Sequence, residues 1–182
     1  MDRCARILHA GSVGAEPVSA PIEVLEHNAP GVAFAVSAGM RRKQLRLPHY
    51  DYAASGAYFV TICTVGRRAH LCGLTGEMVL RHLLRLPARF PGLTVDDNVV
   101  MASHVHAVLL LDGSTPALPR IVQAFKSLTA LEAPAAVRPM WQRGYYEHVV
   151  RDEDELALIR EYIHNNPLAE EIKFGRSALP VL

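Results

Sequence analysis

Two histidines separated by one residue, His104 and His106, stand in the middle of the chain. The residues around them are largely apolar and β-branched, which predicts that the pair lies on a buried strand. Side chains i and i+2 of a strand project from the same face, so the two imidazoles are expected to converge. Neutral imidazoles bind divalent metals, and the pair could form half of a metal site. The same spacing also occurs on the ordinary polar face of a strand.

A tyrosine and an asparagine, Tyr162 and Asn166, are four residues apart near the end of the chain. The segment opens with acidic residues from Asp152 onward and continues with apolar residues at helical spacing, which predicts a helix. Residues i and i+4 share a helix face, so the phenol and the amide would be presented together. A helical tyrosine is commonly a boundary residue, and Asn166 precedes Pro167. Because proline disfavours a helical residue before it, we expect the helix to end near Asn166.

A tyrosine beside a metal-bound phosphate predicts a different reaction from a metal alone. A tyrosine oxygen can attack phosphorus and form a covalent phosphotyrosine, which keeps the bond energy available for rejoining. A metal held by two histidines and the Asn166 amide would polarise the phosphate oxygens and stabilise the charge of the transition state. A hydrolase that uses metal-bound water would not need the tyrosine, so Tyr162 separates strand transfer from hydrolysis.

The elements that must position these residues follow from the hydrophobic pattern. The pattern predicts strands at 57–65 and 93–95, one or two strands within 99–111 with a polar break at Ala102-Ser103, and one or two short strands within 140–151. It predicts helices at 75–87, 118–131 and 152–166. The order strand–helix–strand–strand–helix–strand is typical of a ferredoxin-like sandwich. We therefore expect an α+β fold with a mainly antiparallel sheet and helices on one face.

The composition is that of a globular protein. The chain has 182 residues, of which half are apolar and a fifth charged, and its formal net charge is only +1. It suits one domain with a core, and bulk charge does not indicate a nucleic-acid partner. Three cysteines without CxxC spacing indicate neither a disulfide framework nor a zinc ribbon, and a reducing cytoplasm fits best. The sequence contains no apolar run of membrane-spanning length and no export signal.

Domain organisation and surface charge are less sharply defined by the sequence. We interpret residues 1–40 as a flexible N-terminal extension, 41–176 as the functional domain and 177–182 as a C-terminal tail. The basic segment Arg41–Arg46 could hold a phosphate backbone or could simply be solvated. The same two interpretations apply to three arginines at helical spacing, Arg81, Arg85 and Arg89.

Several segments in a fixed order give the chain a family resemblance. They are Leu47–Tyr52, Gly56–Thr64, Val99–Met101 continuing to His104–His106, Phe125–Ser127, Trp141–Arg151 and Glu161–Pro167. In their order and amino-acid sequence these segments resemble the REP-associated tyrosine transposases, a group within the single-tyrosine HUH transposases. The resemblance extends from about residue 41 to 170, and several ordered motifs are more specific than any one of them.

The resemblance implies roles for the residues singled out above. His104 and His106 would be the HUH pair, Tyr162 the nucleophile and Asn166 the third ligand of a divalent metal, Mg²⁺ or Mn²⁺. The substrate would be single-stranded DNA with a hairpin from a palindromic repeat. Cleavage would leave the 5′ phosphate on the tyrosine and a free 3′ hydroxyl. The protein could act as a monomer or a homodimer.

Contacts to DNA are predicted from residue type. Basic side chains suit phosphates and aromatic rings suit unpaired bases, although each of these residues could equally be surface charge or core. The candidates are Arg67, Arg68, Lys126, Arg143 and Arg151 for phosphates, and Tyr145 and Tyr146 for stacking.

Three functions remain open on the sequence. The first is a DNA strand transferase that works through Tyr162. The second is a descendant that binds repeat hairpins without turnover, which is suggested by Ala102-Ser103 where the family usually has Pro-Asn. The third is a metal-dependent phosphodiesterase that uses water.

Overall fold

The computed structural model describes residues 8–9, 51–52 and 54–177. The basic segment Arg41–Arg46 and most of the extension predicted at 1–40 lie outside the described residues. Within residues 1–40, the described part is β1 (Leu8–His9), which pairs with Val99 and Val100 at the edge of the sheet.

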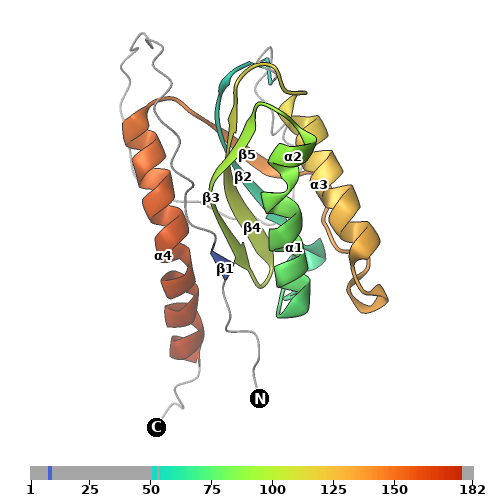
Figure 1. Ribbon diagram of the computed structural model, residues 1–182. Helices are drawn as coiled ribbons and strands as arrows, with labels where there is room; N and C mark the ends of the chain where they lie inside the picture. The colour runs from blue at the N-terminus through green and yellow to red at the C-terminus, as the bar shows by residue number, and fades with distance from the viewer. Residues whose placement is uncertain (1–7, 10–50, 53, 178–182) are drawn as a thin grey trace, which may run out of the picture.

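A five-stranded antiparallel sheet forms the centre of the fold (Figure 1). Its strand order is β1-β3-β4-β2-β5, and the strands after β1 are β2 (Gly56–Cys63), β3 (Leu93–Met101), β4 (His104–Leu111) and β5 (Tyr146–Val150). The helices are α1 (Leu74–Leu84), α2 (Leu86–Arg89), α3 (Leu118–Glu132) and α4 (Glu153–Ser177). Strands β2 to β5 with α1 and α3 follow the ferredoxin-like order. The predicted α+β fold with an antiparallel sheet is confirmed.

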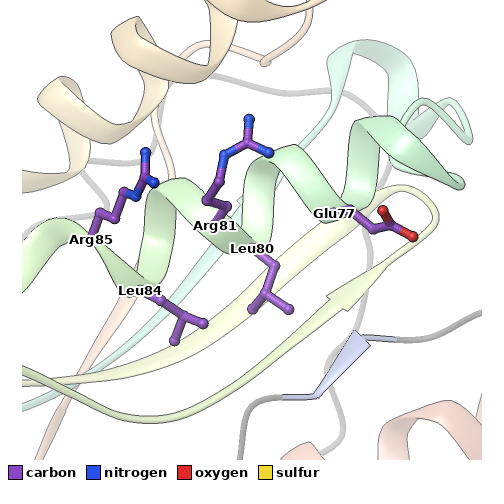
Figure 2. A pocket seen from close by; sticks show the side chains of 5 residues that line it. All are labelled: Glu77, Leu80, Arg81, Leu84 and Arg85. Carbon is purple, nitrogen blue, oxygen red and sulfur yellow. The ribbon is translucent and has the colours of Figure 1, made fainter.

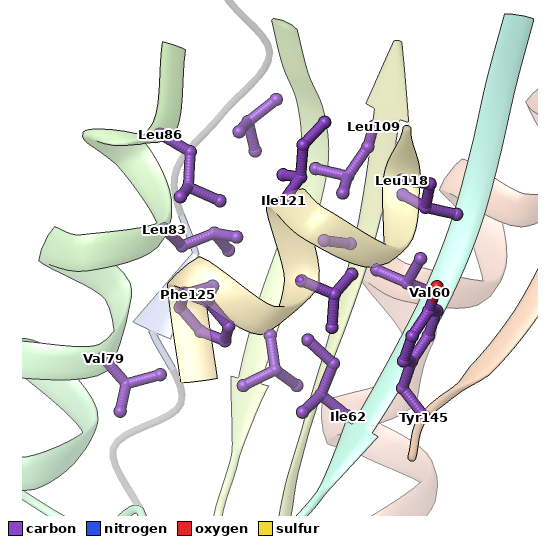
Figure 3. Close-up of a cluster of buried hydrophobic side chains, with 14 of the residues drawn as sticks. Val60, Ile62, Val79, Leu83, Leu86, Leu109, Leu118, Ile121, Phe125 and Tyr145 are labelled. Atoms are coloured by element: carbon purple, nitrogen blue, oxygen red, sulfur yellow. The ribbon is translucent and has the colours of Figure 1, made fainter. Parts of the chain in front are cut away.

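Helices cover both faces of the sheet (Figure 1). Helices α1, α2 and α3 pack on the main core, where Leu83, Ile121 and Phe125 meet the strands (Figure 3). Helix α4 packs on the other face through a second cluster that includes Phe59 and Ile163. The sequence predicted helices on one face, but the strand residues that point away from the main core are also apolar and need cover.

Helix α4 continues through Pro167 to Ser177, so the predicted end near Asn166 is wrong. A proline inside a helix removes one backbone hydrogen bond and crowds the carbonyl four residues earlier, which costs free energy but does not always end the helix. Although α4 has 25 residues, neither it nor any other helix in the described part of the chain is long and apolar enough to cross a membrane.

The cysteines differ in state. Cys63 is a free and buried thiol on β2, whereas Cys72, before α1, is disulfide-bonded. The sequence did not indicate a disulfide, because the spacing of three cysteines that form no motif does not show whether two of them are joined.

Two neighbouring leucines of α1 provide a test of the main core. Leu83 is 1% exposed and Leu84 is 44% exposed. We expect Leu83→Ala to lower the free energy of unfolding by about 2–5 kcal/mol, because it removes buried methyl groups and leaves a cavity. Leu84→Ala is expected to cost less than about 1 kcal/mol. Urea unfolding of both variants measures the difference, and equal losses would contradict the described packing.

Candidate active site

Strand β4 presents both histidines on the face that α4 covers. The ring centroids of His104 and His106 are 4.6 Å apart and their planes cross at 78°. Both side chains are buried, with 7% and 5% exposure. The convergence expected from their i, i+2 spacing is therefore present.

A hydroxyl group lies against one nitrogen of each imidazole. Thr61 Oγ1 lies 2.9 Å from His106 Nδ1, and Ser103 Oγ lies 3.2 Å from His104 Nδ1. Thr61 reaches His106 because the two residues are directly paired between β2 and β4. A hydroxyl at Nδ1 leaves Nε2 as the nitrogen that can bind a metal, and it fixes the orientation of the ring.

The turn before the histidines is held by backbone hydrogen bonds. Both the backbone N–H and the hydroxyl of Thr64 donate to the Ser103 carbonyl, at 2.9 and 3.0 Å. The Leu71 N–H donates to the Ala102 carbonyl at 2.9 Å. The turn is thus fixed by Thr64 and Leu71, although Ala102-Ser103 replaces the Pro-Asn of the family that the sequence resembles.

Burial keeps His106 neutral. Desolvation by burial, with smaller contributions from the nearby His104 and Arg67, lowers the pKa of His106 to about 3. At neutral pH the ring therefore carries no proton on one nitrogen, and that lone pair is available to a metal.

Tyr162 of α4 packs against this histidine. The Tyr162 and His106 ring centroids are 5.4 Å apart at 69°, and Phe59 lies edge-on to Tyr162 at 6.1 Å. Phe59 also stacks on His106 at 5.3 Å. Tyr162 remains 45% exposed. The ring is therefore held at the boundary between the second core cluster and solvent, where a substrate can reach it.

Asn166 lies one helical turn beyond Tyr162 and is buried, at 9% exposure. Strands β4 and β5 run in the same direction because both are antiparallel to β2, and α4 turns back after β5 (Figure 1). Four helical residues advance about 6 Å, and two strand residues about 6.5 Å. If Tyr162 lies level with His106, Asn166 therefore comes level with His104.

A metal at this place would need the amide of Asn166. The described part of the chain contains no group of three His, Cys, Asp or Glu side chains that could hold a metal ion. Two imidazoles and one amide oxygen form a suitable set of donors for a divalent cation that keeps open positions for substrate. The residues present fit a metal in this respect.

Polar contacts that the sequence did not indicate attach α4 to the sheet. Arg160 donates two hydrogen bonds of 2.8 Å to Asp96 on β3. His164 Nε2 lies 3.2 Å from the Oδ2 atom of Asp97, a carboxylate that is 1% exposed. Both aspartates lie where β3 shifts its register against β4, between Val95 and Asn98. The sequence signal for these contacts was the pair of acidic residues, Asp96 and Asp97, inside an otherwise apolar strand.

The predicted phosphate contacts fall into two groups. Four of them are exposed, namely Arg67, Arg68, Arg143 and Arg151. Lys126 instead donates two hydrogen bonds from Nζ to backbone carbonyls, to Gln142 at 2.8 Å and to Gly144 at 2.9 Å. Burial lowers the pKa of Lys126. In this structure Lys126 holds the loop that carries Arg143.

The two neighbouring tyrosines at the start of β5, Tyr145 just before it and Tyr146 as its first residue, have opposite environments. Tyr145 is 9% exposed and lies in the main core, near Val60 (Figure 3). Tyr146 is 47% exposed. Stacking on a base would require Tyr145 to leave the core, whereas the ring of Tyr146 is accessible where it stands.

A pocket on α1 lies away from the histidines. Its lining includes Leu80, Arg81 and Arg85, with the arginines directed to one side of the helix and the leucines to the other (Figure 2). Arg81 and His82 both pair with Glu132 of α3. Helix α1 covers the face opposite to α4, so this arginine row does not contribute to the site around His106.

Comparisons with known proteins support the fold. The structure is similar to that of a REP-associated tyrosine transposase solved with a REP hairpin, with a TM-score of 0.59 and 19% identity over 69% of this chain and 73% of that chain. A candidate transposase of Deinococcus radiodurans R1 gives a TM-score of 0.46 and 23% identity over 69% and 97% of the two chains. The REP-associated tyrosine transposase thus shares the fold of this chain.

The sequence itself has a relative of unknown role. A protein of Haemophilus influenzae Rd, described as uncharacterized, is 29% identical over 163 residues, which cover 71% of this chain and 90% of that protein. No protein-family model matches the chain.

The low pKa of His106 predicts a pH dependence of stability. Between about pH 6.5 and 3, the unfolded chain binds a proton on His106 that the native state does not bind. Stability is therefore lost as the pH falls, by up to about 1.4 kcal/mol per pH unit from this residue. We expect a His106→Gln variant to lack this component of the slope.

Urea unfolding at several values between pH 7 and pH 4, with chelator present, measures the two slopes. Carboxylates titrate in both proteins and cancel in the comparison. Parallel slopes for the wild type and His106→Gln would contradict a neutral, buried His106.

Proposed function

We propose that the protein is a transposase-type DNA strand transferase that cleaves and rejoins single-stranded DNA at hairpins of palindromic repeats. The observation that carries this proposal is the contact between Tyr162 and His106, with His104 beside them. The residues come from α4 and β4, which are remote in sequence, yet they form one partly accessible group. The REP hairpin bound by the structural neighbour supports the substrate class.

In the proposed reaction, the Tyr162 oxygen attacks the scissile phosphorus and releases its phenolic proton to solvent. The bond from phosphorus to the 3′ oxygen breaks, and that oxygen leaves as a hydroxyl group after taking up a proton. The 5′ phosphate remains on Tyr162 as a phosphotyrosine. Attack by another 3′ hydroxyl rejoins the strand and restores the tyrosine.

The chain's own residues would hold a divalent metal, Mg²⁺ or Mn²⁺, beside this tyrosine. His104 and His106 would use their Nε2 atoms, since hydroxyl groups lie at both Nδ1 atoms, and Asn166 would supply an amide oxygen. When bound, such a metal polarises phosphate oxygens and offsets their charge in the transition state.

Exposed arginines at the same end of the sheet would bind the DNA backbone. Arg67 is close enough to His106 to affect its pKa, and Arg143 is carried by the loop that Lys126 holds. Arg68 is also exposed and would contact phosphates further from the tyrosine, whereas the exposed Arg151 lies at the opposite end of β5, beside the acidic start of α4.

Two observations favour strand transfer over the alternatives. A hydrolase that uses water has no need of a phenol packed on the histidine, as Tyr162 is. A descendant without turnover was suggested by the Ala102-Ser103 turn, but that turn is fixed by hydrogen bonds from Thr64 and Leu71. The hydrolase alternative does not explain the position of Tyr162.

Covalent capture tests the proposal. The protein is incubated with labelled single-stranded repeat hairpins and Mg²⁺ or Mn²⁺, with chelator in parallel, and run on a denaturing gel. We expect a metal-dependent protein–DNA band that Tyr162→Phe abolishes, because phenylalanine keeps the ring packing but has no nucleophile. We expect His104→Ala and His106→Ala to reduce the band by a factor of at least about 100.

Tyr58→Phe is the matched control, because it removes a phenol on the opposite face whose hydroxyl donates to the Ala54 carbonyl. It should retain the band. A covalent band that survives Tyr162→Phe would refute the proposal. Cleavage without any band, unchanged in Tyr162→Phe, would indicate the hydrolase, and retardation on a native gel alone would indicate a binding protein.

A further inference from the structure

A row of three side chains crosses the sheet at the candidate active site. Thr61 of β2 is paired with His106 on one side and with Tyr146 of β5 on the other. Directly paired residues in an antiparallel sheet share a face, so Tyr146 lies on the same face as His106. Neighbouring strands are about 4.8 Å apart, which places Tyr146 about 10 Å from His106 across the sheet.

The Tyr146 end of this row is accessible to solvent. Strand β5 forms an edge of the sheet, and Tyr146 is 47% exposed. The side chain of His148, on the same face two residues further, is also 47% exposed. Helix α4 packs mainly against β3 and β4, where Val99, Met101 and Val108 belong to its cluster. An exposed ring on a strand face is a suitable platform for an unpaired base.

The two loops beside Tyr146 are positively charged. The loop after β2 carries Arg67 and Arg68, and the loop before β5 carries Arg143. Hydrogen bonds of 3.0 Å join the two loops, from the Val65 N–H to the Met140 carbonyl and from the Gln142 N–H to the Cys63 carbonyl. Neither segment 64–73 nor segment 139–146 contains an acidic residue.

The other end of β5 has the opposite character. Four consecutive acidic residues lie there, namely Asp152 just before α4 and Glu153 to Glu155 in its first turn. Glu155 accepts a hydrogen bond from the Arg151 N–H and pairs with His148. A phosphate backbone is therefore favoured at the Tyr146 end of the strand and disfavoured at the α4 end.

We propose that Tyr146 stacks on an unpaired base of single-stranded DNA, in a nucleotide next to the phosphate that Tyr162 attacks. The inference rests on the proposed function for the identity of the substrate. Arg67, Arg68 and Arg143 hold the phosphates on either side of that base. Tyr145 does not take this part, because its ring is in the main core.

The test uses a Tyr162→Phe background, which binds but does not cleave, and hairpins with a single-stranded flank. A 2-aminopurine base is placed at one flank position at a time, and its fluorescence and the binding affinity are measured. Quenching is expected at one or two adjacent positions. Tyr146→Ala should abolish it and weaken binding roughly 5- to 100-fold, and Tyr146→Phe should restore both.

His148→Ala is the matched control, because it removes an equally exposed side chain from the same face, and it should bind like the parent. Circular dichroism and thermal unfolding verify that Tyr146→Ala is folded. Unchanged affinity and quenching in folded Tyr146→Ala would overturn the inference, as would no detectable binding by the parent.

The stacking inference and the proposed function can succeed or fail separately. If protein with wild-type Tyr162 forms the covalent adduct but Tyr146→Ala changes nothing, the stacking inference fails and the strand-transfer function stands. If no adduct forms while the quenching depends on Tyr146, the stacking inference stands and the strand-transfer function fails.

Discussion

The packing of α4 on the second face of the sheet is the interaction on which the site depends. Without it, the histidines of β4 would face solvent, and the tyrosine would be far from them. Ile163, fully buried between Tyr162 and Asn166 in sequence, meets Phe59 and its apolar neighbours. The two hydrogen bonds from Arg160 to Asp96 attach the same helix to β3. Apolar burial supplies the driving force, and the bidentate pair fixes the position of α4 along the sheet.

The same packing determines the electrostatics of the site. Covering His106 removes water from the imidazole, and its pKa falls because the charged form is no longer solvated. The hydroxyl of Thr61 satisfies one ring nitrogen in that environment. A neutral, oriented imidazole is thus mainly a consequence of burial by the fold, and the nearby His104 and Arg67 contribute less. The cost is stability at acidic pH.

Local periodicity was sufficient to predict much of this arrangement. The i, i+2 histidines and the i, i+4 pair of Tyr162 and Asn166 depend only on strand and helix geometry. The face that α4 covers and its passage through Pro167 depend on tertiary contacts, which a single sequence does not reveal. The environments of Tyr145 and Tyr146 depend on the register of β5, and either tyrosine could have faced the core. The roles of the site residues and the metal remain predictions.

The central claim is that Tyr162 carries the 5′ phosphate of the DNA. Trypsin cuts after Arg160 and Lys173, so Tyr162 is the single tyrosine of peptide Glu161–Lys173. Mass spectrometry of the nuclease- and trypsin-treated covalent complex measures this directly. We expect this peptide to carry the added mass of a nucleotide 5′-phosphate, with the fragment ions assigning it to Tyr162. The same mass on another peptide, or no modified peptide from a complex that has cleaved its DNA, would contradict the account.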